Sequence, residues 1–410
     1  MVYLGIIGCA IILGLSWIKL KDIIAPPIIL SSIWLLIYIA LLLRKSKINF
    51  DNFYYLSFVF SLFCFILGFF MVVRNRNKTN FEPNRIKKKF NPFLGKLVIA
   101  INSVLFIFYL VKVRSYIFSN FNFNFWQTLN AGRRSGTFVE GNIVLYARIA
   151  IIAFSIVSSI IYFSNPKRGN KLYFLISIFF ATIFVITANN RGIIFLLILS
   201  VFFAFLIIKN YDSMKTLIVL LTTCLILLAV FIVFSFLKFV YQDQSNSLQF
   251  IINQFRIYFT TPPLAFVQWI GSFHEYSYGA NTFRFFSAIL NSLGYNIVIP
   301  NTVQPFTWIY GDYSNVYTVL QYYSSDFGLI YAFFILFVLG AIHGYLYKES
   351  ILKEDKKVFF IALQSVSYYP LIYQFFSDQY FTILSTWLQF LFWIWLFTRS
   401  FLLIDSKDKK

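Results

Sequence analysis

The stretch "NVYTVLQYYSSDFGLIYAFFILFVLGAIHGYLY" (residues 315–347) passes without a break from a polar, tyrosine-rich segment into an apolar run. The apolar part, residues 329–347, is long enough to cross the hydrocarbon core of a bilayer, which is roughly 30 Å thick. Asp326 stands at the junction, directly before Phe327 and Gly328. Similar apolar runs recur along the whole chain, so the sequence predicts an all-α, polytopic membrane protein.

The composition favours a membrane protein over a nucleic-acid-binding one. The 410 residues are 59% hydrophobic and only 12% charged, whereas a soluble domain carries about 25% charged residues. The net charge of +20 comes from Lys and Arg in short connections between apolar runs, so we expect no nucleic acid as a partner. Because Cys9, Cys64 and Cys224 all lie in apolar runs, we expect no disulfide framework.

The apolar runs predict about eleven spans in one integral membrane domain covering residues 1–410. Ten to twelve spans are compatible with their lengths. Pro26 and Pro27 kink the second span or mark its true start. The predicted spans are 2–18, 23–43, 53–73, 97–113, 142–163, 172–188, 193–208, 216–240, 329–347, 358–376 and 381–404.

The distribution of basic residues predicts the orientation. Most of the 35 Lys and Arg residues fall on one side of these spans, including the run from Arg74 to Lys96 and the tail from Arg399. The positive-inside rule makes this side, and the C-terminus with it, cytoplasmic. Arg44, Lys45 and Lys47 fall on the opposite side. An error in the first two spans would explain that conflict.

Three connections then lie on the outer face: residues 114–141, the short "ANNRG" (188–192) and the long segment 241–328. The long segment is rich in apolar and aromatic residues, and Pro262-Pro263 interrupts two expected helices. Such a segment lies in the interface or packs back on the bundle, so we expect a large, partly helical outer loop. Long ordered loops commonly bind substrate or act as lids.

Several common catalytic signatures are missing from the sequence. The two histidines, His274 and His343, have no ligand spacing, so no metal site is expected. Neither a G-x-x-x-x-G-K-[ST] nor a G-x-S-x-G motif occurs. We therefore expect no cofactor, and chemistry based on outward-facing arginines, carboxylates and aromatic residues.

Arginine occurs in four of the predicted outer elements. Because its planar fork binds phosphate through two donors and keeps its charge, several arginines can neutralise a diphosphate leaving group without a metal. The alternative for each is an interfacial anchor, a contact to lipid phosphate or a solvated loop residue. The residues are Arg191 in "ANNRG", Arg256 in "NQFRIYFTTPP", Arg284 in "NTFRFFSAIL", and Arg133 and Arg134 in "NAGRRSG".

A general base for a sugar hydroxyl must come from the outer carboxylates or from His274. Each of these residues is on its own more often a solvated loop residue. The carboxylates are Glu140, Asp243, Glu275, Asp312, Asp326 and Asp378, and we select Asp326, Glu275 and Glu140 as the catalytic candidates.

The position of Asp326 strengthens its candidacy. If residues 315–328 are helical, Asn315, Val319, Tyr322 and Asp326 share one face that leads to the membrane. A stripe of amide, phenol and carboxylate suits carbohydrate, and we add the nearby Tyr317 to the expected glycan contacts. The alternative is an aromatic belt at the membrane interface.

Three passages in this order resemble the Wzy-type polymerases of O-antigen and capsule oligosaccharide repeat units. They are "NNRGIIFLLILSVFFAFLI" (189–207), "FRIYFTTPPLAF" (255–266) and the opening stretch 315–347. The resemblance covers roughly residues 180–350. It implies an architecture like that of the GT-C glycosyltransferases, metal independence, and a location in the bacterial inner membrane.

The resemblance implies a membrane glycosyltransferase that joins oligosaccharide units carried on undecaprenyl diphosphate, at the outer face of that membrane. Expected partners are the lipid-linked oligosaccharide, membrane lipids and a chain-length regulator of the same pathway. Two alternatives stay open. One is a flippase or transporter of the lipid-linked unit, although no inverted repeat is visible. The other is an O-antigen ligase or another membrane transferase, for which His274-Glu275 is the feature to watch. His343 in "AIHGY" is better explained by helix packing through small residues.

Overall fold

The computed structural model describes the chain from Met1 to Asp405 with interruptions. Long stretches of described residues alternate with short gaps, within which a few single residues are also placed. The described stretches are 1–44, 52–74, 88–119, 141–188, 191–239, 247–272, 275–301, 306–353 and 357–405.

Within these stretches the chain is dominated by long apolar helices, as the sequence predicts. Nine helical segments are long and apolar enough to cross a membrane, and the shorter apolar helices α15 and α16 lie where the last two spans are expected. Pro26 and Pro27 open α2, so the proline pair marks the start of this span. The helices are α1 (Val2–Leu20), α2 (Pro26–Leu43), α3 (Leu56–Val72), α4 (Pro92–Ser119), α6 (Asn142–Ser164), α7 (Arg168–Thr187), α8 (Arg191–Lys209), α9 (Ser213–Phe239), α14 (Leu329–Tyr347), α15 (Val358–Tyr373) and α16 (Leu384–Phe397).

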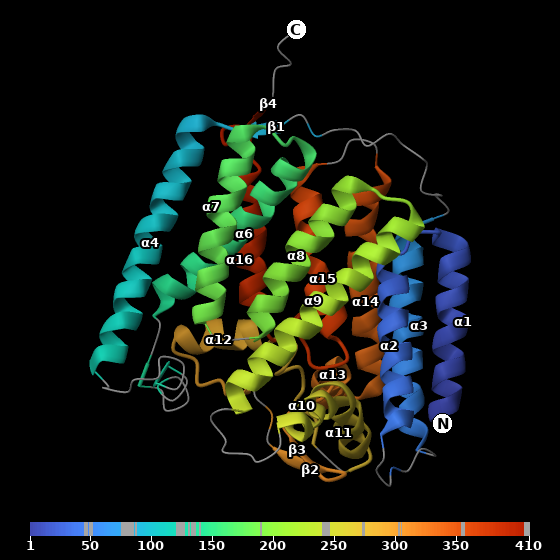
Figure 1. The fold of residues 1–410 in the computed structure, drawn as a ribbon. Helices are drawn as coiled ribbons and strands as arrows, with labels where there is room; N and C mark the ends of the chain where they lie inside the picture. The colour runs from blue at the N-terminus through green and yellow to red at the C-terminus, as the bar shows by residue number, and fades with distance from the viewer. Residues whose placement is uncertain are drawn as a thin grey trace.

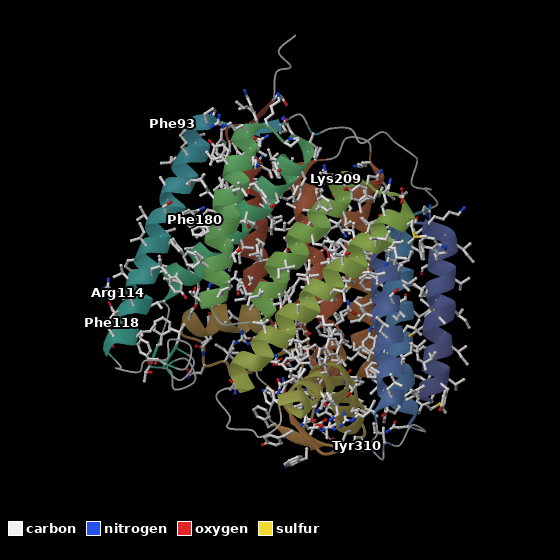
Figure 2. All side chains as sticks on the ribbon, viewed as in Figure 1. Phe93, Arg114, Phe118, Phe180, Lys209 and Tyr310 are labelled. Atoms are coloured by element: carbon white, nitrogen blue, oxygen red, sulfur yellow. The ribbon has the colours of Figure 1, made fainter. Side chains whose placement is uncertain are left out.

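These helices form one bundle that has two different ends (Figure 1). At one end, strand β1 (Lys88–Phe90) pairs antiparallel with β4 (Leu403–Asp405), which joins the start of α4 to the exit of α16. The opposite end, here called the loop end, carries the elements between α9 and α14. Figure 2 shows Lys209 at the β1–β4 end and Tyr310 at the loop end. The chain thus alternates between two ends, as a polytopic protein requires.

The segment between α9 and α14 is folded and partly helical. It contains α10 (Ser247–Phe255), the π-helical turn η2 (Arg256–Thr260), α11 (Thr261–Ile270), α12 (Arg284–Ser292) and α13 (Val319–Phe327). Strands β2 (Thr307–Ile309) and β3 (Asp312–Ser314) form a hairpin. Two short sheets therefore accompany the helices, which the all-α expectation did not include. Pro262-Pro263 lies near the start of α11, directly after η2.

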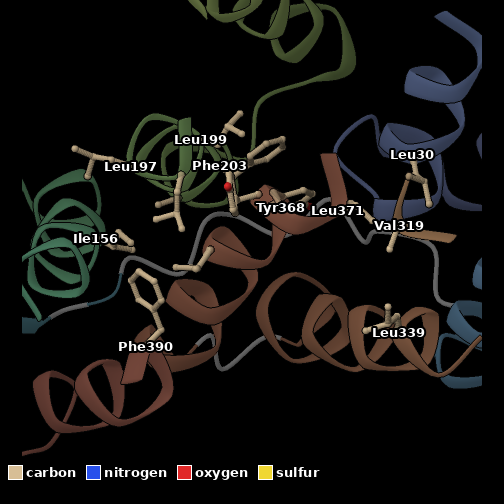
Figure 3. Packing of buried hydrophobic residues seen from close by; sticks show 14 of the residues in the cluster. Leu30, Ile156, Leu197, Leu199, Phe203, Val319, Leu339, Tyr368, Leu371 and Phe390 are labelled. Carbon is tan, nitrogen blue, oxygen red and sulfur yellow. The ribbon is translucent and has the colours of Figure 1, made fainter. Parts of the chain in front are cut away.

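Close backbone contact joins α3 to α14. A methyl group built on Gly340 would overlap the carbonyl oxygen of Phe65, and one on Gly68 would overlap that of Phe337. Glycine permits this approach because it has no side chain, which confirms small-residue packing around "LGAIHGY". Elsewhere aromatic rings fill the core. Figure 3 shows Tyr368 of α15 beside Phe203 of α8, with the two rings stacked at 3.6 Å between centroids.

The opening stretch is two helices separated by a break. Helix α13 starts at Val319 after Thr318, so the expected helical stripe from Asn315 is wrong at its start, and Asn315 lies outside the helix. Gly328 separates α13 from α14 with φ 84° and ψ 179°, a conformation that essentially only glycine adopts. Val319, Tyr322 and Asp326 are all buried, so this face points into the protein.

Candidate functional site

Asp326 ties α13 to the segment that precedes α12. Its carboxylate is fully buried. It accepts hydrogen bonds from Ser277 Oγ at 2.7 Å and from the backbone N–H and Nδ2 of Asn281, both at 3.0 Å. It also accepts them from the backbone N–H of Thr282 at 2.8 Å and from Thr282 Oγ1 at 2.6 Å. Five donors from one short segment occupy both oxygens, as expected for a buried carboxylate without a cation.

These bonds hold in place a segment in which Tyr276 and Tyr278 are exposed. Glu275 is exposed and lies two residues before Ser277. The backbone N–H of Ser277 also donates to the carbonyl of Ser325 at 2.8 Å. Among the catalytic candidates that the structure describes, Glu275 therefore has the accessible carboxylate. The geometry favours a positioning role for Asp326.

A second carboxylate, Asp312, holds two arginines at the loop end. Arg44 Nη2 donates to Asp312 Oδ2 at 2.8 Å, and Arg256 Nη2 donates to Oδ1 at 2.7 Å. Arg256 Nε adds bonds of 3.1 Å to both oxygens, and Thr261 Oγ1 donates to Oδ2 at 3.2 Å. Two guanidinium groups share one carboxylate, so the group Arg44–Asp312–Arg256 has a net charge of +1.

The two arginines differ in exposure. The side chains of Arg44 and Asp312 are 2% and 3% exposed, whereas that of Arg256 is 37% exposed. Arg44 also donates to Thr260, Thr261 and the carbonyls of β2–β3, so it joins α2 to η2 and to the hairpin. Among the residues described, Nη1 of Arg256 has no hydrogen-bond partner. Asp312 thus orients one edge of Arg256 and leaves the other available for an anion.

Arg191 lies between aromatic rings at the start of α8. Its guanidinium carbon is 5.1 Å from the ring centres of both Phe231 in α9 and Tyr258 in η2. Rings within about 6 Å attract such a cation. The ring of Tyr258 in turn stacks on that of Phe376, with 5.3 Å between the ring centres, and this contact holds Tyr258 in place beside Arg191. Because Tyr258 and Arg256 both belong to η2, this single turn contributes to both arginine environments.

A polar network joins α13 to the connection between α15 and α16. Tyr323 donates to Asp378 Oδ1 at 2.7 Å, and the backbone N–H groups of Tyr380 and Thr382 donate to the same carboxyl at 2.8 Å. Burial nevertheless raises the pKa of Asp378. Burial, reinforced by the nearby Asp378 and Tyr317, also raises the pKa of Tyr322 to about 12. Tyr317 and Tyr322 are brought together here, but both are buried.

The remaining predicted site residues are more dispersed. Arg284 starts α12, and its Nε donates to the carbonyl of Pro300 at 2.9 Å. Asn315 is partly buried before α13. Arg133, Arg134, Glu140 and His274 lie outside the described residues.

The sequence reasoning missed Arg44 as a member of this site. The sequence feature that could have pointed to Arg44 is its position on the side of the membrane that carries few basic residues, where the positive-inside rule does not expect it. The contact with Asp312 gives a structural reason for that position: the two residues are 268 positions apart in the chain and meet at the loop end. Lys45 and Lys47, the other two residues of that conflict, lie outside the described residues.

Within the described parts of the chain, no three His, Cys, Asp or Glu side chains gather as metal ligands do. The described residues of the loop end offer guanidinium groups, phenols and the accessible carboxylate of Glu275. No protein-family model matches this chain, and no curated protein and no solved structure is significantly similar to it.

Proposed function

We propose that this chain is a membrane glycosyltransferase that polymerises oligosaccharide repeat units carried on a polyprenyl diphosphate. The product would be an O-antigen, capsular or exopolysaccharide chain. The observation that carries the proposal is the group Arg44–Asp312–Arg256, which holds a partly exposed guanidinium with net positive charge at the loop end. This arrangement suits a diphosphate leaving group.

The proposed reaction breaks one bond and forms another. The bond between the anomeric carbon of the growing chain and its diphosphate breaks, and the acceptor hydroxyl oxygen bonds to that carbon. The hydroxyl proton goes to a general base, and the polyprenyl diphosphate leaves with both bonding electrons. Arg256 would stabilise the charge that develops on the diphosphate, which is where fixed cations contribute most. Arg191, held between Phe231 and Tyr258, is the second candidate for this role.

Glu275 is the base that we propose, because its carboxylate is exposed while that of Asp326 is saturated by five internal donors. Asp326 would position the segment that carries Glu275. Tyr317 and Tyr322 would shape the wall behind the acceptor glycan.

Helix α12 supports a substrate with a lipid tail. Phe286 and Leu290 of α12, and Phe283 directly before it, are exposed, while Arg284 and Ser287 are partly buried. Figure 1 shows α12 lying across the loop end instead of along the bundle. An exposed apolar stripe on such a helix fits the boundary between headgroups and acyl chains. A polyprenyl diphosphate would present its charged group at this level.

The test is the length distribution of surface glycan in cells that carry single variants. Arg256→Ala should leave the chain in the membrane but lower the rate of polymerisation at least about 100-fold, as loss of a transition-state donor does. Arg256→Lys should restore little, because lysine lacks the planar fork. Glu275→Gln should also yield single repeat units. Arg168→Ala, an exposed arginine at the β1–β4 end, is the matched control.

Long glycan chains in the Arg256→Ala and Glu275→Gln cells would contradict the proposed site. Complete loss of surface glycan in cells lacking the protein, including single units, would instead indicate a flippase. Single units that persist on the surface are the expected result.

A further inference from the structure

A cavity of about 470 Å³ opens at the β1–β4 end, remote from the loop end. It lies where strand β1, the start of α15 and the end of α16 meet. Its size is within the range of small-molecule sites, roughly 300–1,000 Å³. The residues that line it are Ile86, Lys88, Lys357, Val358, Phe359, Trp395, Thr398, Arg399, Ser400 and Leu403.

Three cations line this cavity. Lys88 pairs with Asp405 at 2.6 Å. Arg399 lies over the ring of Trp395, at 3.9 Å from the ring centre, and Lys357 is exposed directly before α15. Within the described parts of the chain, neither Lys357 nor Arg399 forms an ion pair with a carboxylate. Among the described residues at the cavity, positive charges therefore outnumber negative ones, and an anion would neutralise this excess.

The cavity also has apolar walls, and an apolar track leads away from it. Val358 and Leu403 are buried in its wall, and Trp395 is 43% exposed. Leu388, Leu391 and Phe392 are also exposed, and together with Trp395 their spacing places them on one face of α16. This face leads from the cavity along the bundle. A free phosphate would contact the cations but would leave the walls and the track uncovered.

We propose that this cavity binds the phosphate of an anionic glycerophospholipid, with an acyl chain along the exposed face of α16. Basic pockets between transmembrane helices recognise acidic headgroups in this way, and tryptophan is enriched at the headgroup level. Lys357 and Arg399 supply the donors for the phosphate oxygens. Trp395 holds Arg399 in place and begins the acyl track. This site is independent of the proposed polymerase function.

The test is lipid retention by the full chain, purified in detergent and measured by native mass spectrometry. Added phosphatidylglycerol should be retained in preference to phosphatidylcholine at equal concentration. Lys357→Gln and Arg399→Gln should each weaken retention about fivefold, since a basic residue near a lipid phosphate contributes roughly this factor. Lys357→Arg should retain the lipid. Lys19→Gln is the matched control, because Lys19 is also an exposed cation over an aromatic ring, Phe70, but does not line the cavity.

Competition by free phosphates and the control variants decide between a lipid site, a phosphate site and diffuse attraction to the surface. Inorganic phosphate or glycerol 3-phosphate that displaces phosphatidylglycerol at equal concentration would overturn the lipid assignment in favour of a free phosphate. Equal weakening by Lys19→Gln would overturn the site, because it would indicate diffuse attraction to the surface. If a glutamine variant fails to fold, Trp395→Ala should still lower retention by removing the support of Arg399, and unchanged retention in that variant would contradict the proposal.

Discussion

At the scale of single residues, two carboxylates of the loop end, Asp326 and Asp312, are committed to the protein's own donors. Asp326 accepts five hydrogen bonds from the segment 277–282, and Asp312 accepts bonds from two arginines and a threonine. A carboxylate without free lone pairs is a poor base for a substrate. Burial costs a charged group its hydration, so internal donors are a condition of its being there at all.

Replacing Asp326 tests the positioning role. In Asp326→Asn the side-chain amide would face the N–H of Thr282 instead of accepting its hydrogen bond, and a bond to a charged acceptor contributes about 1.5–3 kcal/mol. We expect a loss of about 2 kcal/mol in the free energy of unfolding in detergent, and faster hydrogen exchange over residues 275–282. Ser277→Ala removes one of the five donors and leaves the other four on the carboxylate, so it should cost about 1.5 kcal/mol, the lower end of that range.

A comparison with Glu275 separates positioning from catalysis. If Asp326 positions the segment, polymerisation by Asp326→Asn falls together with faster hydrogen exchange over residues 275–282, whereas Glu275→Gln loses polymerisation while hydrogen exchange stays that of the parent. The opposite pattern would identify Asp326 as the base.

At the scale of secondary structure, the contact between α3 and α14 fixes the position of α14, the apolar half of residues 315–347. Gly68 of α3 and Gly340 and Gly344 of α14 bring the two backbones together. Lipid tails are as apolar as leucine, so association of spans depends on such packing more than on hydrophobicity. Because α14 follows α13 after Gly328 alone, this contact also sets where α13 and Asp326 lie.

Adding a methyl group at this contact should separate the helices. Gly340→Ala should lower the melting temperature by several degrees or prevent accumulation, since its Cβ would overlap the backbone of Phe65 and overpacking costs about 1–3 kcal/mol. Gly14→Ala is the matched control, because a methyl group there meets nothing within 4 Å and alanine is the better helix former. Equal melting temperatures of the two variants would contradict close packing of α3 and α14.

At the scale of the whole molecule, the two ends differ in their elements and in their charged groups. The loop end holds Arg44, Arg256 and Arg191 in specific contacts with a carboxylate or with rings. The β1–β4 end presents exposed cations around a cavity. The distribution of Lys and Arg predicts that the β1–β4 end faces the cytoplasm, which would place the proposed glycan chemistry on the outer side.

Reporter fusions test this orientation. A phosphatase that is active only outside the cytoplasm should be active when fused after Pro300 and inactive when fused after Asp405. A fluorescent protein that folds only in the cytoplasm should give the reverse result. Fluorescence from a fusion after Pro300 would place the loop end in the cytoplasm. It would contradict both the predicted orientation and the proposed function, which requires the loop end on the outer side.

The sequence by itself determined where the long apolar helices lie, since the length of an apolar run and the position of a proline pair are local properties that a bilayer selects directly. It also located most of the arginines and carboxylates of the candidate site. Only the tertiary structure decided which of them meet: Arg44 reaches Asp312 across 268 positions, and Asp326 turns to the segment 277–282 instead of to solvent. A charge pattern reports on which side of the membrane a residue lies. Its partner depends on how the helices pack and on which buried donors remain to be satisfied.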